Sequence, residues 1–180
     1  MIWFCSDYHI NHNKDFIIDP RNFMSVEDMN YQIVQRHNRF VADDDIVYML
    51  GDNMMGTIEE AAPYLTQLKG EIHFIIGNHD TDKRIEFYED MGWINEGYAT
   101  ILVHNKIHYY LSHYPTMTGN YDEEKDWRRG LYNLFGHTHQ QNVFYNNNAH
   151  MIHIGFDTWG RPVSIDEIEK IIKKEVIPYV

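Results

Sequence analysis

Five short apolar runs in this chain each end abruptly in residues whose side chains bind divalent metal ions. The five junctions are Asp7-Tyr8-His9, Gly51-Asp52, Gly77-Asn78-His79-Asp80, His113 and Gly136-His137-Thr138-His139. Their donors are carboxylate, amide and imidazole groups without a thiolate, a set that suits Mn, Fe, Zn or Mg ions. If the runs are strands, a sheet presents these donors at one point. The sequence therefore predicts a metal-centred site, with two ions because the donors are too many for one.

The spacing inside the junctions also suits metal binding. Residues two apart in an extended chain face the same way, so Asp7 and His9 can reach one ion. His137 and His139 share this spacing and can bind one ion each or the same ion.

Glycines precede three of the candidate donors and predict sharp turns out of the strands. At Gly51, Gly77 and Gly136 the backbone can take positive φ angles and approach a ligand closely. In the third junction His79 stands directly before Asp80, and a neighbouring carboxylate can fix an imidazole tautomer and raise its basicity.

Strand-like runs alternate with helical segments over most of the chain, which predicts an α/β fold. Four helices are expected: from Ser25, from Thr57 to near Gly70, over 82–90, and from Ser164 to before Pro178. Ser25, Thr57 and Ser164 each stand three residues before an acidic residue, a spacing typical of a capping box. Pro63 predicts a kink or a later start in the second helix.

The back half of the chain is richer in strands. Runs 101–104 and 107–111 flank Asn105-Lys106, and runs 143–145 and 150–154 flank 146–148, so two hairpins are expected. Residues 116–130 show no periodicity and lie between two junctions. They are predicted to form a loop over the site.

Length and composition indicate a single domain over residues 1–180. The chain has a mass of 21.6 kDa and 43% apolar residues, enough for a hydrophobic core. No apolar stretch approaches the roughly 18 residues of a membrane span, and no signal peptide is recognised, so no membrane partner is expected. The single cysteine, Cys5, is expected to be buried. It excludes an internal disulfide and predicts a reducing, cytoplasmic setting.

The formal net charge of −12 argues against long nucleic acids as partners, because proteins that bind them cluster Lys and Arg. A phosphorylated small molecule stays compatible with this charge. Two divalent ions bring four positive charges to a site whose carboxylates, Asp7 and Asp52, supply two negative ones.

The junctions and their order resemble the calcineurin-like metallophosphoesterases. That family carries D-x-H, GD, GNH with a following acidic residue, a single metal-binding His, and GHxH, and all five blocks stand here in order between residues 7 and 139. The rest of the chain is similar to the small bacterial and phage members, as in Arg21-Asn22-Phe23. Asn53, after Gly51-Asp52, departs from the protein phosphatases and speaks against phosphoprotein phosphatase activity.

The resemblance implies a four-layer α/β/β/α sandwich with two divalent ions, Mn first and Fe, Zn or Mg as alternatives. It implies Asp7, His9 and His139 for the first ion, Asn78, His113 and His137 for the second, and Asp52 bridging both. A hydroxide between ions roughly 3.5–4 Å apart is then the nucleophile. His79, oriented by Asp80, is expected to act as the acid at the leaving oxygen.

Two further residues are candidate substrate contacts. His12, three residues after His9, is near enough to touch substrate, and Arg21 could contact phosphate or be a solvated loop arginine. His153 is expected to be a hydrogen-bonded or surface histidine, although its run follows the last junction directly.

The predicted function is the hydrolysis of phosphate esters. Phosphodiesters or nucleotides of modest size are favoured, because the acidic surface disfavours long polymers. One alternative is a phosphomonoesterase. Another is a non-catalytic binding module, since a retromer subunit uses this fold with an altered metal centre, but the intact donor set speaks against it. The oligomeric state and the native metal stay open.

Overall fold

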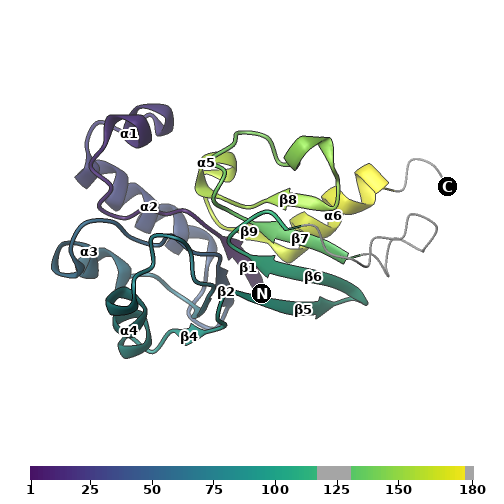
Figure 1. The fold of residues 1–180 in the computed structure, drawn as a ribbon, viewed down its shortest axis with the longest axis horizontal. Coiled ribbons are helices and arrows are strands. Elements are labelled where there is room, and N and C mark those ends of the chain that lie inside the picture. The colour runs from purple at the N-terminus through teal and green to yellow at the C-terminus, as the bar shows by residue number, and fades with distance from the viewer. Residues whose placement is uncertain (117–130, 177–180) are drawn as a thin grey trace.

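Two sheets form the centre of the fold in the computed structural model, which describes residues 1–116 and 131–176 (Figure 1). The strands are β1 (Ile2–Cys5), β2 (Ile46–Met49), β3 (Glu71–Phe74), β4 (Ile94–Asn95), β5 (Ala99–His104), β6 (Ile107–Ser112), β7 (Leu131–Phe135), β8 (Met151–His153) and β9 (Val163–Ser164). The helices are α1 (Asp15–Arg21), α2 (Val26–Phe40), α3 (Ile58–Leu65), α4 (Asp82–Asp90), α5 (Phe156–Trp159) and α6 (Ile165–Val176).

The strand directions explain why the junctions meet. The first sheet has the order β4-β3-β2-β1-β9, with β1 to β4 parallel and β9 antiparallel. The second has the order β5-β6-β7-β8, with β6, β7 and β8 parallel. Parallel strands place their carboxyl ends at the same edge of a sheet. The five junctions follow the carboxyl ends of β1, β2, β3, β6 and β7.

Two apolar cores hold the layers together. Helices α2, α3 and α4 pack on one face of the first sheet, as Ile33, Leu65 and Tyr88 do against Phe74 and its neighbours. The second core lies between the sheets, where the Phe4 and Tyr109 rings are 6.5 Å apart, and α6 also contributes to it. Figure 1 shows α1 to α4 together on one side of the molecule and the second sheet with α6 on the other. The predicted α/β sandwich is confirmed.

Most of the expected local signals act as predicted. Thr57 begins α3 with a complete capping box, and the side chains of Ser25 and Ser164 accept from the backbone N–H groups three residues on. Asn105 and Lys106 have φ angles of 49° and 69° in the β5–β6 hairpin, as a tight primed turn requires. Cys5 is buried and free.

Helix α3 differs from the prediction in two ways: it has no later start at Pro63, which was one of the two alternatives expected there, and it ends before Gly70. Helix α3 runs through Pro63 from Ile58 without a later start, because the carbonyl that loses its bond there belongs to the exposed Glu59 and can reach water. It also ends at Leu65 rather than near Gly70. After Leu65, backbone hydrogen bonds between residues three apart, as in a 3₁₀ turn, replace the α-helical bonds between residues four apart.

The second expected hairpin also differs from the prediction. Residues 145–147 form a 3₁₀ turn and only Phe144 bridges Ile152, while β8 pairs in parallel with β7. The loop expected over 116–130 falls almost wholly outside the described residues and stays a prediction. Among the described residues, no helix combines the length and hydropathy needed to span a bilayer.

Buried His37 on α2 gives the fold a pH dependence. Its Nε2 lies 2.9 Å from the Lys69 carbonyl, which only accepts, so Nδ1 accepts the Tyr8 hydroxyl at 2.8 Å and the ring is neutral. Burial lowers the pKa of His37 to about 4. The unfolded chain binds a proton here near pH 6.5 and the folded chain does not, so stability is lost as pH falls from about 6.5 to 4.

We therefore expect His37 to cost about 2 kcal/mol of unfolding free energy between pH 7 and pH 5. His37→Gln keeps a donor for Lys69 and should remove this part of the slope in urea unfolding of the metal-free protein. His108→Gln, at an exposed site on β6, is the matched control. An unchanged slope in His37→Gln would contradict the assignment.

Candidate metal centre

Backbone hydrogen bonds draw the junction loops of both sheets together. Asp7 N–H donates to the Gly51 carbonyl at 3.1 Å, and Gly136 N–H donates to the His113 carbonyl at 3.0 Å. The imidazole Nδ1 of His113 lies 2.8 Å from the carbonyl oxygen of Leu50 and joins the second sheet to the first. The donors therefore meet where the two sheets meet.

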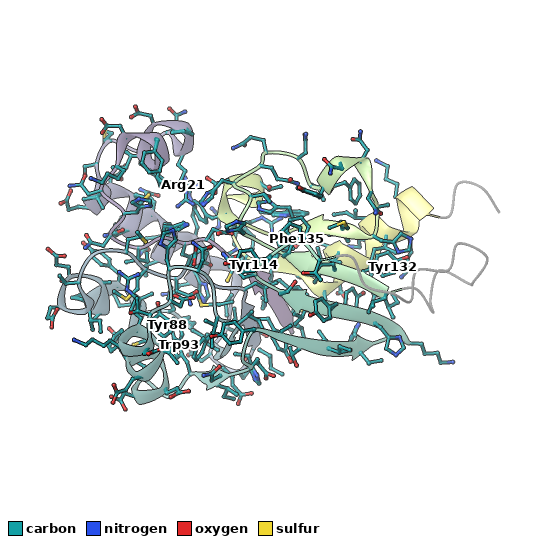
Figure 2. All side chains as sticks on the ribbon, viewed as in Figure 1. Arg21, Tyr88, Trp93, Tyr114, Tyr132 and Phe135 are labelled. Carbon is teal, nitrogen blue, oxygen red and sulfur yellow. The ribbon has the colours of Figure 1, made fainter. Side chains whose placement is uncertain are left out.

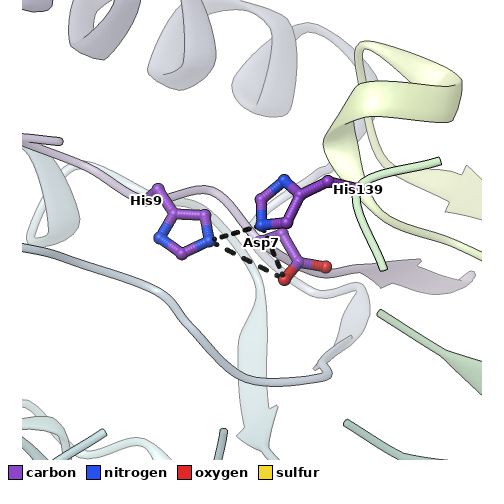
Figure 3. Close-up of side chains that lie close together, drawn as sticks. All are labelled: Asp7, His9 and His139. Carbon is purple, nitrogen blue, oxygen red and sulfur yellow. Dashed lines mark hydrogen bonds and ion pairs between the residues drawn. The ribbon is translucent and has the colours of Figure 1, made fainter. Parts of the chain in front are cut away.

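One donor group consists of Asp7, His9 and His139 (Figure 3). Its ligand atoms lie within 4.8 Å of one another, and the Nε2 atoms of His9 and His139 are 3.1 Å apart. Each of these nitrogens lies 3.8–3.9 Å from Asp7 Oδ1. Two imidazole nitrogens facing each other beside a carboxylate are a suitable donor set for a divalent cation.

A second donor group adjoins the first. Asp7, Asp52 and His113 also offer ligand atoms within 4.8 Å of one another. The Asn78 side-chain oxygen lies 2.9 Å from His113 Nε2 and 2.8 Å from His137 Nδ1. All seven predicted donors are thus brought together in two adjacent groups.

Asp52 lies between these groups. Its Oδ2 is 3.4 Å from His113 Nε2 and 3.8 Å from His9 Nε2. Its Oδ1 accepts the backbone N–H of His79 at 2.8 Å. Asp7 also belongs to both groups, so two carboxylates share the central position that the sequence suggested for one.

The donors converge through left-handed turns rather than through strand alternation. Asp7, His9, Asp52, His137 and His139 have φ angles of 56°, 50°, 56°, 66° and 47°. Such angles cost L-residues energy and persist where the surrounding structure enforces them, which is common at functional sites. Asp7 and His9 reach the same donor group, as expected. The expected reason, an extended backbone between them, was wrong, because both residues have positive φ angles.

Two glycines are required by the close approach of the loops. A Cβ atom at Gly77 would collide with Asp52 Oδ1, and one at Gly136 would collide with Asp7 Oδ2 and the Ser6 hydroxyl. The predicted close backbone approach at these glycines is therefore present, and the object approached is the carboxylate itself.

The electrostatics of the site favour a bound cation. Burial raises the pKa of Asp7 to about 6, which His113 and His139 offset only in part. Burial also acts against the charge of Asp52, but the hydrogen bond and charge of His113 hold its pKa at about 2. Two carboxylates with little access to water, surrounded by imidazoles, fit divalent ions as ligands.

A cavity of about 390 Å³ opens beside the donor groups. Its lining residues are His9, His12, Phe16, Ile17, Asp52, Met55, Asn78, His79, His137 and His139. The His79 side chain is 42% exposed, and its Nε2 lies 3.9 Å from Asp52 Oδ2. His12 and His79 thus lie where the sequence analysis expected groups that face substrate.

Arg21 has partners other than the expected phosphate. Arg21 lies at the end of α1 (Figure 2). Its guanidinium donates to both carboxylate oxygens of Asp157 on α5 at 2.9 and 3.0 Å. It also donates to the carbonyls of Tyr8 at 3.0 Å and Asp7 at 2.7 Å. The Arg21 side chain is only 2% exposed, and it holds the first junction loop through these two backbone carbonyls.

Asp80 also has partners other than the expected one. Its Oδ2 accepts the backbone N–H groups of Asp52 at 2.9 Å and Gly77 at 2.8 Å, and its Oδ1 accepts the Tyr88 hydroxyl at 3.0 Å. The carboxylate ties two junction loops together, and the structure gives it no contact that orients the His79 ring.

Asp157 was not among the predicted site residues, and it accepts the His139 Nδ1–H at 2.7 Å. Burial alone would raise the pKa of Asp157, but hydrogen bonds from His139 and Arg21 hold it well below its usual range. The pattern that found the other junctions recurs here, since the apolar run 151–154 ends in Gly155 and leads to Asp157.

Comparisons with known proteins agree with this geometry. The family described as "Calcineurin-like phosphoesterase superfamily domain" matches residues 1–162. An uncharacterized protein of Methanocaldococcus jannaschii is 34% identical over 181 residues, which cover 96% of this chain and 92% of that protein. The Gene 66 protein of Mycobacterium phage L5 is 27% identical over 206 residues, with 94% and 93% covered.

Among solved structures, a protein of unknown function from Aquifex aeolicus has the same fold, with a TM-score of 0.68. It is 24% identical, and the match covers 95% of this chain and 98% of that one. Two packed sheets that present Asp, Asn and His donors at their strand ends define a metal-dependent phosphoesterase. The chain belongs to the calcineurin-like phosphoesterase superfamily, as the five junctions predicted.

Proposed function

We propose that this enzyme hydrolyses phosphodiesters or nucleotides of modest size with two divalent ions. The observation that carries the proposal is the convergence of seven donors beside a cavity of about 390 Å³. In this assignment Asp7, His9 and His139 hold the first ion, Asn78, His113 and His137 hold the second, and Asp52 binds both. Mn is the proposed metal, with Fe, Zn or Mg as alternatives, because the donors are oxygen and nitrogen atoms.

The protein residues divide the remaining tasks. Divalent ions supply positive charge for the phosphoryl oxygens and a water acidic enough to act as nucleophile at neutral pH. His79 lines the cavity with an accessible ring, so it can donate a proton to the leaving oxygen. Its backbone N–H is held by Asp52, which places the ring relative to the donors. His12 is proposed to contact the substrate from the same cavity.

The proposal is tested by metal analysis together with a substrate panel. Metal-depleted protein reconstituted with excess Mn should contain two ions per chain and should hydrolyse bis-p-nitrophenyl phosphate and cyclic nucleotides faster than p-nitrophenyl phosphate. Faster hydrolysis of the monoester would favour the phosphomonoesterase. Bound metal without hydrolysis of any substrate would favour a binding module. The cytoplasmic location stays a prediction that rests on the single cysteine.

The cavity wall supports a nucleotide substrate. Phe16, Ile17 and Met55 form its apolar side, and Phe16 is 69% exposed. The Phe16 and His12 rings are nearly perpendicular, with centroids 5.4 Å apart, and the high exposure of Phe16 lets a flat group stack on it. A base stacked on an aromatic side chain gains about 1–3 kcal/mol.

Phe16→Ala should therefore lower kcat/KM for thymidine 5′-p-nitrophenyl phosphate about tenfold. Methyl p-nitrophenyl phosphate has the same leaving group without the nucleoside, and its kcat/KM should stay within about twofold. Phe16→Tyr should restore the loss, and Met24→Ala, 91% exposed and outside the cavity lining, is the control. Equal losses on both esters would argue against a stacked base.

A further inference from the structure

The buried ion pair of Arg21 and Asp157 lies outside the two donor groups. It contacts two residues of the first group, the ring of His139 and the backbone carbonyl of Asp7. Asp157 accepts His139 Nδ1–H at 2.7 Å and receives both arms of the Arg21 guanidinium at 2.9 and 3.0 Å. Arg21 in turn donates to the backbone carbonyls of Tyr8 and Asp7. The Arg21 and Asp157 side chains are 2% and 6% exposed, so water has little access to these contacts.

The contact with Asp157 determines which ring nitrogen of His139 faces the donor group. Since a carboxylate only accepts, Nδ1 carries a proton and the Nε2 lone pair points toward His9 Nε2 at 3.1 Å. A carboxylate on the far nitrogen of a metal-binding imidazole fixes its tautomer and orientation and raises its basicity.

The contacts of Arg21 act on Asp7, another residue of the first donor group. The carbonyl that Arg21 holds at 2.7 Å belongs to Asp7, whose φ of 56° is strained for a residue with a side chain. The planar guanidinium matches a carboxylate in two parallel bonds while its other donors reach the carbonyls, which an ammonium cannot do. One ion pair therefore positions Asp7 and His139, two donors that are far apart in the chain.

We propose that Asp157 is a positioning residue for the first donor group and that Arg21 couples it to the Asp7 loop. The pair presets His139, which belongs to the first group alone, and Asp7, which belongs to both groups. Ion affinity therefore depends on Asp157 more strongly in the first group than in the second. This inference rests on the proposed function, which assigns the two groups to two ions.

The test is a Mn titration of metal-depleted protein by calorimetry and electron paramagnetic resonance, which reads binding without turnover. Asp157→Asn keeps the shape of the side chain and loses its charge. It should weaken the ion site of the first group about 10- to 100-fold and the site of the second group much less. The less affected site serves as an internal control for folding.

Arg21→Lys is a second variant, which keeps a positive charge and loses the planar fork. It should weaken the same site, but less than Asp157→Asn does. Glu167→Gln, which breaks the ion pair between Arg161 and Glu167 of α6, is the matched control and should change neither site.

Equal weakening of both sites, or no weakening of either, would overturn the positioning role. Failure of the wild-type protein to bind two ions would overturn the donor assignment and the proposed function as well. Normal two-ion binding by the wild-type protein without hydrolysis would overturn the proposed function. The positioning role would then still be decided by the Mn titration of Asp157→Asn.

Discussion

Asp52→Asn is expected to reduce phosphodiester hydrolysis by about 10³-fold, because an ion centre is worth several kcal/mol of charge stabilisation. Asp52 Oδ2 lies near a nitrogen of each donor group, at 3.4 Å from His113 and 3.8 Å from His9. An amide in this place removes one negative charge from both groups. Both ions should therefore bind more weakly, and metal content should fall for both together.

The comparison variants make this result specific. His9→Ala should weaken mainly the ion of the first group, since His9 belongs to that group alone. Asp45→Asn removes a carboxylate that binds the N-terminus and Trp3, outside the donor groups, and should change stability without changing metal content. Loss of a single ion in Asp52→Asn would show that Asp52 serves one group only.

His79→Asn should keep both ions and lose rate in proportion to the need of the leaving group for a proton. Removal of a general acid costs about 10²–10⁴-fold. p-Nitrophenolate leaves as a stable anion and needs little help, whereas an alkoxide or ribose oxygen needs much more. The loss should therefore be far larger for alkyl and nucleotide esters than for p-nitrophenyl esters.

Asn78→Ala is the matched comparison for His79→Asn. Asn78 contacts His113 and His137, so this variant should lose metal and slow both ester classes alike. Both variants are assayed at saturating Mn, with metal content measured in parallel. Equal losses for His79→Asn on both classes would indicate general stabilisation of phosphate charge, and loss of metal would make His79 a ligand.

The candidate donors could be predicted because their signals are local. Each follows an apolar run within a few residues, and the parallel direction of β1, β2 and β3 brings the ends of such runs to one edge. Helix starts could be predicted for the same reason, since Thr57 and Glu60 form a capping box within three residues. Such signals lie within a few residues of one another and can therefore be recognised without knowledge of the distant packing.

The contacts of Arg21 with Asp157 and of Asp80 with Asp52 could not be predicted, because these residues are not adjacent in the chain. Arg21 and Asp157 are 136 positions apart, and Asp80 reaches Asp52 across 28. Nothing within a few residues of Arg21 shows whether it faces phosphate or a buried carboxylate. The sequence thus determined the candidate donors and their order along the chain. The packing of α1 and α5 against the strand ends decided which charged side chains hold these donors in place. The physical reason is that a buried charge requires a partner, and only the tertiary structure supplies one.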